Sequence, residues 1–254
     1  MSHPLFSLSR RRALVTGGSR GLGFAMATGL AEAGAEVILA ARSRDALDAA
    51  AETLRAAGHA VGTVVLDVTD PADCDAALDR LEAEAPVDIL FANAGLQHRG
   101  PLHEFAPEDF DRLLSVNVAG VFHAARAAAR HMIARGRGKI VATASIQTAL
   151  ARPTIAPYTA TKGAVANLVK GMAADWGPLG LQCNAIAPGY FDTPMNAALV
   201  ADPEFTAWVT RRTPAGRWGK LDDLKGAAIF LASDASAYVN GQTLFVDGGM
   251  SVTL

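Results

Sequence analysis

The sequence contains little of what marks several large classes of protein. Only two of its 254 residues are cysteines, Cys74 and Cys183. They stand far apart and match no metal-ligand spacing, so we expect two reduced thiols and neither a disulfide framework nor a metal site. The charges nearly cancel, because 23 Lys and Arg face 25 Asp and Glu. That balance leaves no basic surplus for nucleic acid or for an anionic membrane.

Long apolar runs are also missing. No stretch approaches the roughly 20 apolar residues that a membrane span needs. The N-terminal segment carries basic residues, but no apolar run long enough for a signal peptide follows them. We therefore expect a soluble, cytoplasmic protein with neither a membrane nor a nucleic-acid partner.

Short apolar segments alternate with helical patterns along the whole chain. We expect strands at 13–16, 36–41, 61–66, 87–92, 139–144, 181–187 and 244–246, with six helices between them. One long helix is expected over about 107–134, and the helix that carries Tyr158 is expected to end at about Trp176. This alternation predicts a single-domain α/β fold, a Rossmann-type doubly wound parallel sheet of seven strands with helices on both faces. Asp70 and Asp222 are expected to cap helices. Residues 190–220 interrupt the alternation, and we expect a helical substrate lid there.

A glycine-rich turn joins the first strand to the first helix. Glycines let the backbone approach a pyrophosphate, and the N-terminus of a helix offers free N–H groups. An ordinary turn would explain the glycines alone, but their place between strand and helix favours a dinucleotide. The predicted cofactor contacts are Gly17, Ser19, Arg20, Gly21, Leu22 and Gly23.

The end of the second strand indicates which nicotinamide cofactor binds. An acidic residue there would bind the adenine ribose hydroxyls of NAD. This chain has Ala41 and then Arg42, and Arg42 and Arg20 can both pair with a 2′-phosphate. We therefore expect NADP(H) in preference to NAD(H), although Arg42 could simply be solvated. Later strand ends supply further expected cofactor contacts, at Asp67, Val68, Asn93, Ala94 and Gly95, although Asp67 could equally be a turn or helix-cap residue.

Tyr158 and Lys162 are four residues apart and share one face of a predicted helix. A phenol has a pKa of about 10, and a neighbouring ammonium should lower it toward the working range of a general acid. Ser145 follows the fifth strand, at the edge where such sheets bind ligands. The Tyr–Lys spacing alone more often marks a surface pair, and a polar Asn117 in an apolar stretch is more often structural.

Taken together, the motifs resemble the short-chain dehydrogenase/reductase family over nearly the whole chain. They are the glycine turn, Asn93-Ala-Gly95, Asn117, Ser145, Tyr158-x-x-x-Lys162 and Pro188-Gly189. The resemblance implies that Tyr158 exchanges the proton and that Lys162 lowers its pKa and binds the nicotinamide ribose. It also implies that Ser145 positions the substrate oxygen and that Asn117 holds a relay water with Lys162. Cofactor contacts at Asn93, Pro188, Gly189 and Thr193, and a homotetramer, are implied as well.

A narrower resemblance is to family members that interconvert D-gluconate and 5-keto-D-gluconate. Stretches 93–99, 187–193 and 205–218 carry it. A sugar acid needs a forked cation for its carboxylate and polar partners for its hydroxyls. The expected substrate residues are Arg99, Gln147, Arg152 and Tyr190. Relatives with near-identical motifs use other sugars and keto acids. The alternatives are a reductase of 3-oxoacyl thioesters or apolar ketones, and a non-catalytic NADP(H)-binding sensor.

Overall fold

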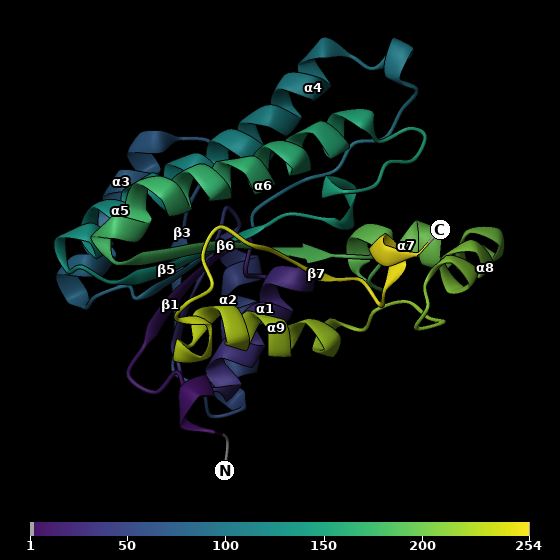
Figure 1. The fold of residues 1–254 in the computed structure, drawn as a ribbon. Helices are drawn as coiled ribbons and strands as arrows, with labels where there is room; N and C mark the ends of the chain where they lie inside the picture. The colour runs from purple at the N-terminus through teal and green to yellow at the C-terminus, as the bar shows by residue number, and fades with distance from the viewer. Residues whose placement is uncertain (1–2, 254) are drawn as a thin grey trace.

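Seven parallel strands form one sheet in the order β3-β2-β1-β4-β5-β6-β7 (Figure 1). The structure is a computed structural model that describes residues 3–253. The chain reverses its direction of winding between β1 and β4, and this is the point where such sheets bind ligands. The strands are β1 (Arg12–Thr16), β2 (Glu36–Ala41), β3 (Val61–Val65), β4 (Ile89–Ala92), β5 (Gly138–Thr143), β6 (Leu181–Pro188) and β7 (Thr243–Val246).

Helices cover both faces of this sheet. One face carries α3 (Pro71–Glu84), α4 (Pro107–Leu114), α5 (Gly120–Ala134) and α6 (Ala156–Trp176), and the other carries α1 (Gly21–Glu32), α2 (Arg44–Ala56) and α9 (Lys225–Ala232) (Figure 1). Every residue of β5 is buried, as expected for a parallel strand covered on both sides. The predicted doubly wound α/β class is confirmed.

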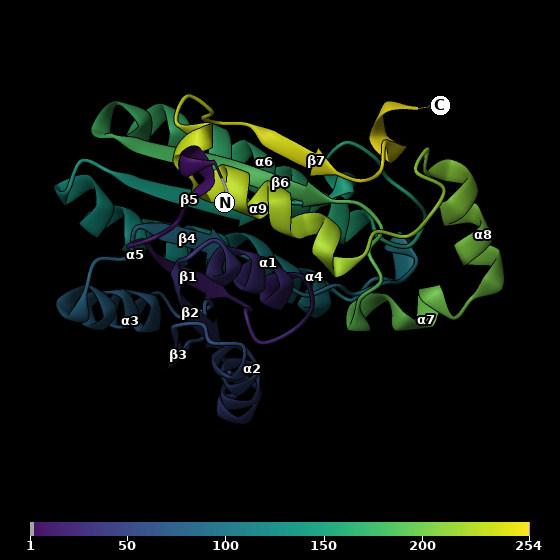
Figure 2. The same ribbon diagram turned by 90° about the horizontal axis from the view of Figure 1, so that it is seen from below.

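The expected helix count of six is wrong, because two regions are more broken than the sequence indicates. The helix expected over 107–134 contains a π-helical turn, Ser115–Ala119, between α4 and α5. Residues 190–220 form a 3₁₀ turn and two short helices, α7 (Ala197–Val200) and α8 (Pro203–Arg212). These lie beyond the carboxyl ends of β6 and β7, outside both helix layers (Figure 2).

The two predicted caps differ in outcome. Asp70 does cap α3, since its carboxylate accepts hydrogen bonds from the N–H groups of Ala72 and Asp73. Asp222 does not cap α9. It lies inside a 3₁₀ turn, Leu221–Leu224, and its carboxylate pairs instead with Lys225, 3.0 Å away. The 3₁₀ turn takes up the residues before Lys225, so the α-helix starts later than expected.

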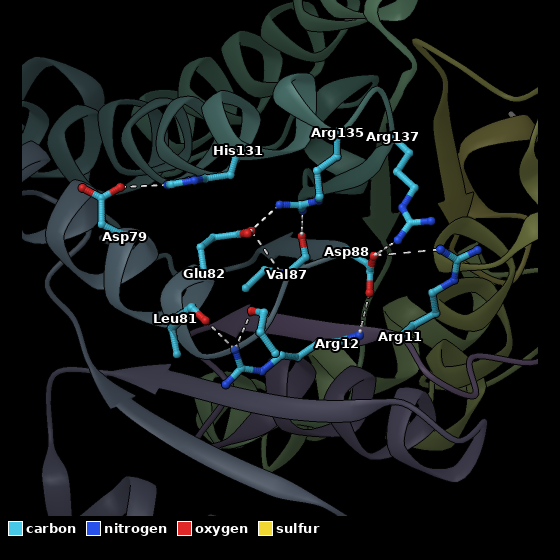
Figure 3. Close-up of polar contacts among 11 residues, drawn as sticks. Arg11, Arg12, Asp79, Leu81, Glu82, Val87, Asp88, His131, Arg135 and Arg137 are labelled. Carbon is cyan, nitrogen blue, oxygen red and sulfur yellow. Dashed lines mark hydrogen bonds and ion pairs between the residues drawn. The ribbon is translucent and has the colours of Figure 1, made fainter.

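The amino ends of the strands are tied together by buried polar contacts (Figure 3). Arg12 opens β1 and is 8% exposed, and its guanidinium donates to the carbonyl oxygens of Leu81 at 2.6 Å and Ala85 at 2.8 Å. These are carbonyls at the C-terminus of α3, where a cation is favoured. The backbone N–H of Arg12 donates to Asp88 at 3.1 Å. One side chain thus joins α3 to the sheet on the side away from the cleft described below.

No helix within residues 3–253 is long and apolar enough to cross a membrane. In the same part of the chain, His, Cys, Asp and Glu form no group of three that could hold a metal ion.

Candidate active site

A cleft of about 710 Å³ opens at the carboxyl ends of the strands. The loops that follow β1 to β6 line it. All predicted site residues contribute to its wall except Asn117, which is completely buried beneath it. Residues that the chain spreads over 177 positions, from Gly17 to Thr193, therefore meet in one cavity.

The glycine turn after β1 lies so close to the loop after β4 that a side chain on Gly23 would not fit between them. Gly17 and Gly21 have φ angles of 64° and 57°, a region that favours glycine. A Cβ on Gly23 would overlap both the Gly17 carbonyl oxygen and the Asn93 amide. The N-cap of α1, Arg20, makes no side-chain cap bond, so α1 presents its first N–H groups to the cleft. This geometry suits the pyrophosphate of a dinucleotide.

Asn93 and Thr16 hold this turn in place. The Asn93 amide donates to the carbonyl oxygens of Thr16 at 3.0 Å and Gly17 at 3.3 Å. The Thr16 hydroxyl accepts from the backbone N–H groups of Asn93 and Ala94, each at 3.0 Å. Thr16 was not among the predicted site residues, although its position directly before the first glycine was the signal available.

Arg20 and Arg42 line the part of the cleft that follows β1 and β2. Within residues 3–253, neither the Arg20 nor the Arg42 side chain forms a hydrogen bond or ion pair. Asp67, the only acidic residue in the described cleft wall, accepts from the N–H and hydroxyl of Thr69 at 3.0 and 2.8 Å. The Thr69 N–H is the main cause that lowers the pKa of Asp67. Asp67 thus holds a turn, and both guanidinium groups stay available to an anion.

Ser145, Tyr158 and Lys162 meet in the middle of the cleft. The Ser145 hydroxyl accepts from the N–H of Gln147 at 3.2 Å. Lys162 is buried, its ammonium lies 5.6 Å from the centroid of the Tyr158 ring, and it donates to the Thr143 carbonyl oxygen at 2.6 Å. Thr143 was also missed by sequence analysis, because its backbone makes the contact and leaves no signal in the residue type.

The pKa values differ from expectation. Burial raises the pKa of Tyr158 to about 12, and the Ser145 hydroxyl and the Arg99 charge oppose that rise. Burial lowers the pKa of Lys162 to about 8. The expected shift of the Tyr158 pKa toward the working range is therefore not seen, and stabilisation of the Tyr158 phenolate by Lys162 stays a prediction. The reason is that desolvation dominates both groups, while the Lys162 ammonium points to the Thr143 carbonyl.

Asn117 occupies the π-helical turn between α4 and α5. Its amide oxygen accepts from the Leu96 N–H at 2.9 Å, and its amide nitrogen donates to the Leu96 carbonyl at 2.9 Å and the Thr161 hydroxyl at 3.1 Å. The amide donors are therefore fully used, and they lock the loop after β4 onto α6. No hydrogen bond joins Asn117 to Lys162 among the described residues, so the relay role stays a prediction. Thr161 is a further residue that sequence analysis missed.

The other end of the cleft is positively charged. Arg99 donates to Gln97 at 3.0 Å and to Asn196 at 3.4 Å. Arg152 donates to the Tyr190 hydroxyl at 3.1 Å. Burial and the nearby charge of Arg152 both lower the pKa of Arg99. No acidic residue of the described chain lines this end, so the charges of Arg99 and Arg152 share one end of the cleft without a counter-charge.

Aromatic rings connect the Arg152 site to the short helices outside the sheet. Tyr190 packs edge-on against Phe205, Trp208 and Trp218, with ring centroids 5.6 to 5.8 Å apart. The Arg152 guanidinium lies over the Phe205 ring, 5.4 Å from its centroid. Asn196, at the end of the 3₁₀ turn before α7, reaches Arg99 from the same segment. His98, from the loop singled out in the sequence, is not in the cleft wall and packs on Phe105.

The chain is similar to proteins of known activity over its full length. Residues 17–251 match a family model described as enoyl-(acyl carrier protein) reductase. The chain is 58% identical to a gluconate 5-dehydrogenase of Gluconobacter oxydans, over 100% of both proteins. It is 44% identical to a 5-keto-D-gluconate 5-reductase of Escherichia coli, over 98% of this chain and 99% of that one. The crystal structure of a gluconate 5-dehydrogenase from Burkholderia cenocepacia in complex with NADP and tartrate is 54% identical, covers 98% of each chain and has a TM-score of 0.96.

Proposed function

Because the chain belongs to the short-chain dehydrogenase/reductase family and is an NAD(P)-dependent oxidoreductase, we propose that it interconverts a sugar acid and its keto form. The substrate pair we propose is D-gluconate and 5-keto-D-gluconate, with NADP(H) as the cofactor. The names of the two curated relatives support this pair.

The observation that carries the substrate proposal is the pair of arginines at one end of the cleft. Arg99 and Arg152 bring two positive charges together with no acidic residue beside them in the described wall. A substrate carboxylate would relieve their repulsion and could be bound by two parallel hydrogen bonds. An acyl thioester or an apolar ketone would leave that charge unbalanced. A sugar acid therefore fits the cleft better than the alternatives.

The proposed chemistry uses the side chains in the middle of the cleft. The bound nicotinamide supplies or takes the hydride. In the direction of reduction, the Ser145 and Tyr158 hydroxyls would donate hydrogen bonds to the ketone oxygen. The Tyr158 proton then passes to that oxygen as the carbonyl carbon gains the hydride, which gives the secondary alcohol and a tyrosinate. Lys162, when protonated, would stabilise the tyrosinate.

Arg20 and Arg42 support the choice of NADP(H). Both line the cleft and have free guanidinium groups within the described residues, so both can pair with a 2′-phosphate. Arg42→Asp should weaken NADPH binding tenfold or more, by roughly 1.4 kcal/mol, and change NADH binding little. Fluorescence titration with both cofactors measures this. Arg44→Asp, two residues further along the chain at the start of α2 and outside the cleft wall, is the control. An unchanged cofactor ratio would remove Arg42 from the recognition of the phosphate.

Assembly and location are parts of the same proposal. We propose a homotetramer, as the family resemblance implies, located in the cytoplasm, and a single functional domain whose residues 190–220 cover the substrate. Light scattering at micromolar concentration would measure the mass of the assembly.

The deciding experiment is a measurement of initial rates with 5-keto-D-gluconate, NADPH and NADH. Rapid oxidation of NADPH with slow oxidation of NADH is the expected result. A neutral ketose and a 3-oxoacyl thioester should be poor substrates in the same assay. If the thioester or an apolar ketone is reduced faster, the sugar-acid proposal fails while the reaction class stands. No turnover of any ketone would favour a cofactor-binding sensor.

A further inference from the structure

Gln147 has a buried side chain that the fold leaves without a partner. The residue is 7% exposed and lines the cleft. Its Oε1 atom is one of four buried side-chain polar atoms in the described chain that lack a hydrogen bond, with Asp75 Oδ1, Arg135 Nε and Thr159 Oγ1. Of these four residues only Gln147 contributes to the cleft wall. Buried polar atoms are nearly always hydrogen-bonded, so this one needs an explanation.

The position of Gln147 relative to the reacting group is fixed. Ser145 is the N-cap of a 3₁₀ turn, Ile146–Thr148, and its hydroxyl accepts from the Gln147 N–H at 3.2 Å. Ile146 is buried on one side, and the Thr148 hydroxyl donates to the Lys162 carbonyl at 3.4 Å on the other. Gln147 therefore lies two residues after Ser145, whose hydroxyl would hold the substrate oxygen, and its backbone is held in place by the hydrogen bond to that hydroxyl.

We propose that the Gln147 amide binds a hydroxyl on a carbon next to the reacting carbon. This proposal rests on the proposed function, in which the substrate is a polyhydroxylated acid. An amide offers both a donor and an acceptor, and so does a hydroxyl, so the two groups match in either orientation. A carboxylate at the far end would reach the arginines while the hydroxyl beside the carbonyl reaches Gln147. The cleft thereby distinguishes an α-hydroxy ketone from a simple keto acid.

This specificity has a physical reason, which is the hydrogen-bond partner that the Gln147 amide gains from the substrate hydroxyl. A substrate that lacks the hydroxyl leaves the buried amide unsatisfied in the complex, and a site built around a hydrogen bond rejects such analogues strongly. Gln147 thus gains its partner within the protein–substrate complex only when the right substrate binds.

The test compares two variants on three substrates. The substrates are 5-keto-D-gluconate and its analogues that lack the hydroxyl on carbon 4 or on carbon 6. The unmodified enzyme should prefer the full substrate over one of the two analogues by about tenfold or more in kcat/KM. In Gln147→Leu that preference should fall to within about twofold. Gln97→Leu is the matched contrast, since Gln97 contacts Arg99 and should affect all three carboxylates alike.

A second readout does not involve turnover. Removal of an unsatisfied buried amide should raise the Tm of Gln147→Leu by about 2 °C or more, because the leucine needs no hydrogen bond. A structural role for Gln147 would lower the Tm instead. Unchanged discrimination in Gln147→Leu, an equal loss on all three substrates, or weaker NADPH binding would each overturn the proposal.

Failure of this proposal can be separated from failure of the proposed function. If no sugar acid is turned over but a neutral ketose is, the sugar-acid assignment fails. The same comparison is then made with that ketose and its deoxy analogue at the neighbouring carbon. Loss of discrimination in Gln147→Leu would still support the hydroxyl contact, and its persistence would still overturn it.

Discussion

The pKa values of Tyr158 and Lys162 are shifted in opposite directions from their ordinary values, and burial causes both shifts. Burial disfavours the charged form of any group, so it raises the pKa of the Tyr158 phenol and lowers that of the Lys162 ammonium. Both groups are thus held closer to neutrality than free side chains.

Loss of the Tyr158 hydroxyl should lower the rate of turnover without changing the stability of the fold. Tyr158→Phe should lower kcat by roughly 10²–10⁴, because it removes the proton that we assign to the ketone oxygen. Affinity for NADPH and the Tm should change little. Steady-state kinetics, cofactor titration and thermal unfolding measure the three quantities. Tyr238→Phe, a fully exposed tyrosine, is the control and should be silent. Retention of most of the turnover by Tyr158→Phe would exclude Tyr158 as the acid.

Lys162 should leave a signature in the pH dependence of stability. Its pKa is 10.5 in a free side chain and about 8 in the fold, so between these values the unfolded chain binds a proton that the folded chain lacks. The free energy of unfolding therefore rises with pH through that window, and below pH 8 folding must bury the charge. Relative to the parent protein, Lys162→Met should be most stable at pH 7.5. The difference in free energy of unfolding between the variant and the parent should then fall by up to roughly 3 kcal/mol as the pH rises to 10.5.

Urea unfolding of both proteins from pH 7.5 to 10.5 measures this difference. Lys139 gives the matched control, because burial also lowers its pKa to about 8 at the other end of the sheet, where it donates to Ser236. Lys139→Met should show the same trend in stability and keep its turnover. A difference between Lys162→Met and the parent protein that does not vary with pH would contradict the prediction.

Among the elements, the segment between β6 and α9 contributes most to the substrate end. Its aromatic cluster surrounds Tyr190, and the hydroxyl of Tyr190 holds Arg152. The C-terminal residues are attached to the same segment, since Arg212 of α8 donates to the Thr253 carbonyl at 2.8 Å. We therefore expect Tyr190 to position the arginine, while the predicted contact of Tyr190 with the substrate stays a prediction.

Tyr190→Phe should test that role. The ring would still fill its place among the aromatic side chains, but Arg152 would lose one hydrogen-bond acceptor. We expect the KM for 5-keto-D-gluconate to rise about 5- to 10-fold, as for the loss of about 1 kcal/mol, while kcat and the KM for a neutral ketose stay the same. Kinetics of Tyr190→Phe, Arg152→Ala and the double variant measure the coupling. Additive effects would show that the two residues act separately.

How far the sequence predicts an element depends on whether local patterns determine it. The strands and α6 follow from apolar runs and end within one or two residues of expectation. Buried strands were predictable because parallel sheets need apolar side chains on both faces. The π-helical turn at Asn117 was not, because it depends on the loop at Leu96 and on Thr161 from α6. The start of α9 was also missed, because a 3₁₀ turn at Leu221–Leu224 precedes it.

The same distinction applies to the candidate site. Residues recognised by type and spacing, such as Gly23 and Tyr158, all lie at the cleft. Thr143 and Asn196 escaped notice because one acts through its carbonyl and the other meets Arg99 only after folding. The Tyr158 pKa was misjudged for a related reason, since spacing reveals the neighbouring lysine and not the extent of burial.

For the molecule as a whole, the two ends of the sheet differ in construction. The amino end is closed by Arg12 and its contacts to α3, whereas the carboxyl end opens into the cleft. Arg12→Met should lower the free energy of unfolding by about 2–3 kcal/mol, because it leaves carbonyl oxygens of α3 without donors. The KM values should not change. Denaturant unfolding with kinetics tests this, and Arg137→Met is the control, because that exposed arginine lies 3.8 Å from Asp88 and should cost under about 1 kcal/mol.

The separation of the two ends also bears on how such an enzyme can diversify. Contacts to the proposed carboxylate come from one loop after β4, one after β5 and the segment that carries Asn196, while Tyr158 and Lys162 belong to the long helix α6. Changes confined to positions 97–99, 152 and 195–196 leave the strands and the Arg12 contacts intact. A library randomised only at these positions should yield variants with altered substrate preference and unaltered folding. We therefore expect that a few substitutions suffice to change the substrate specificity of this chain.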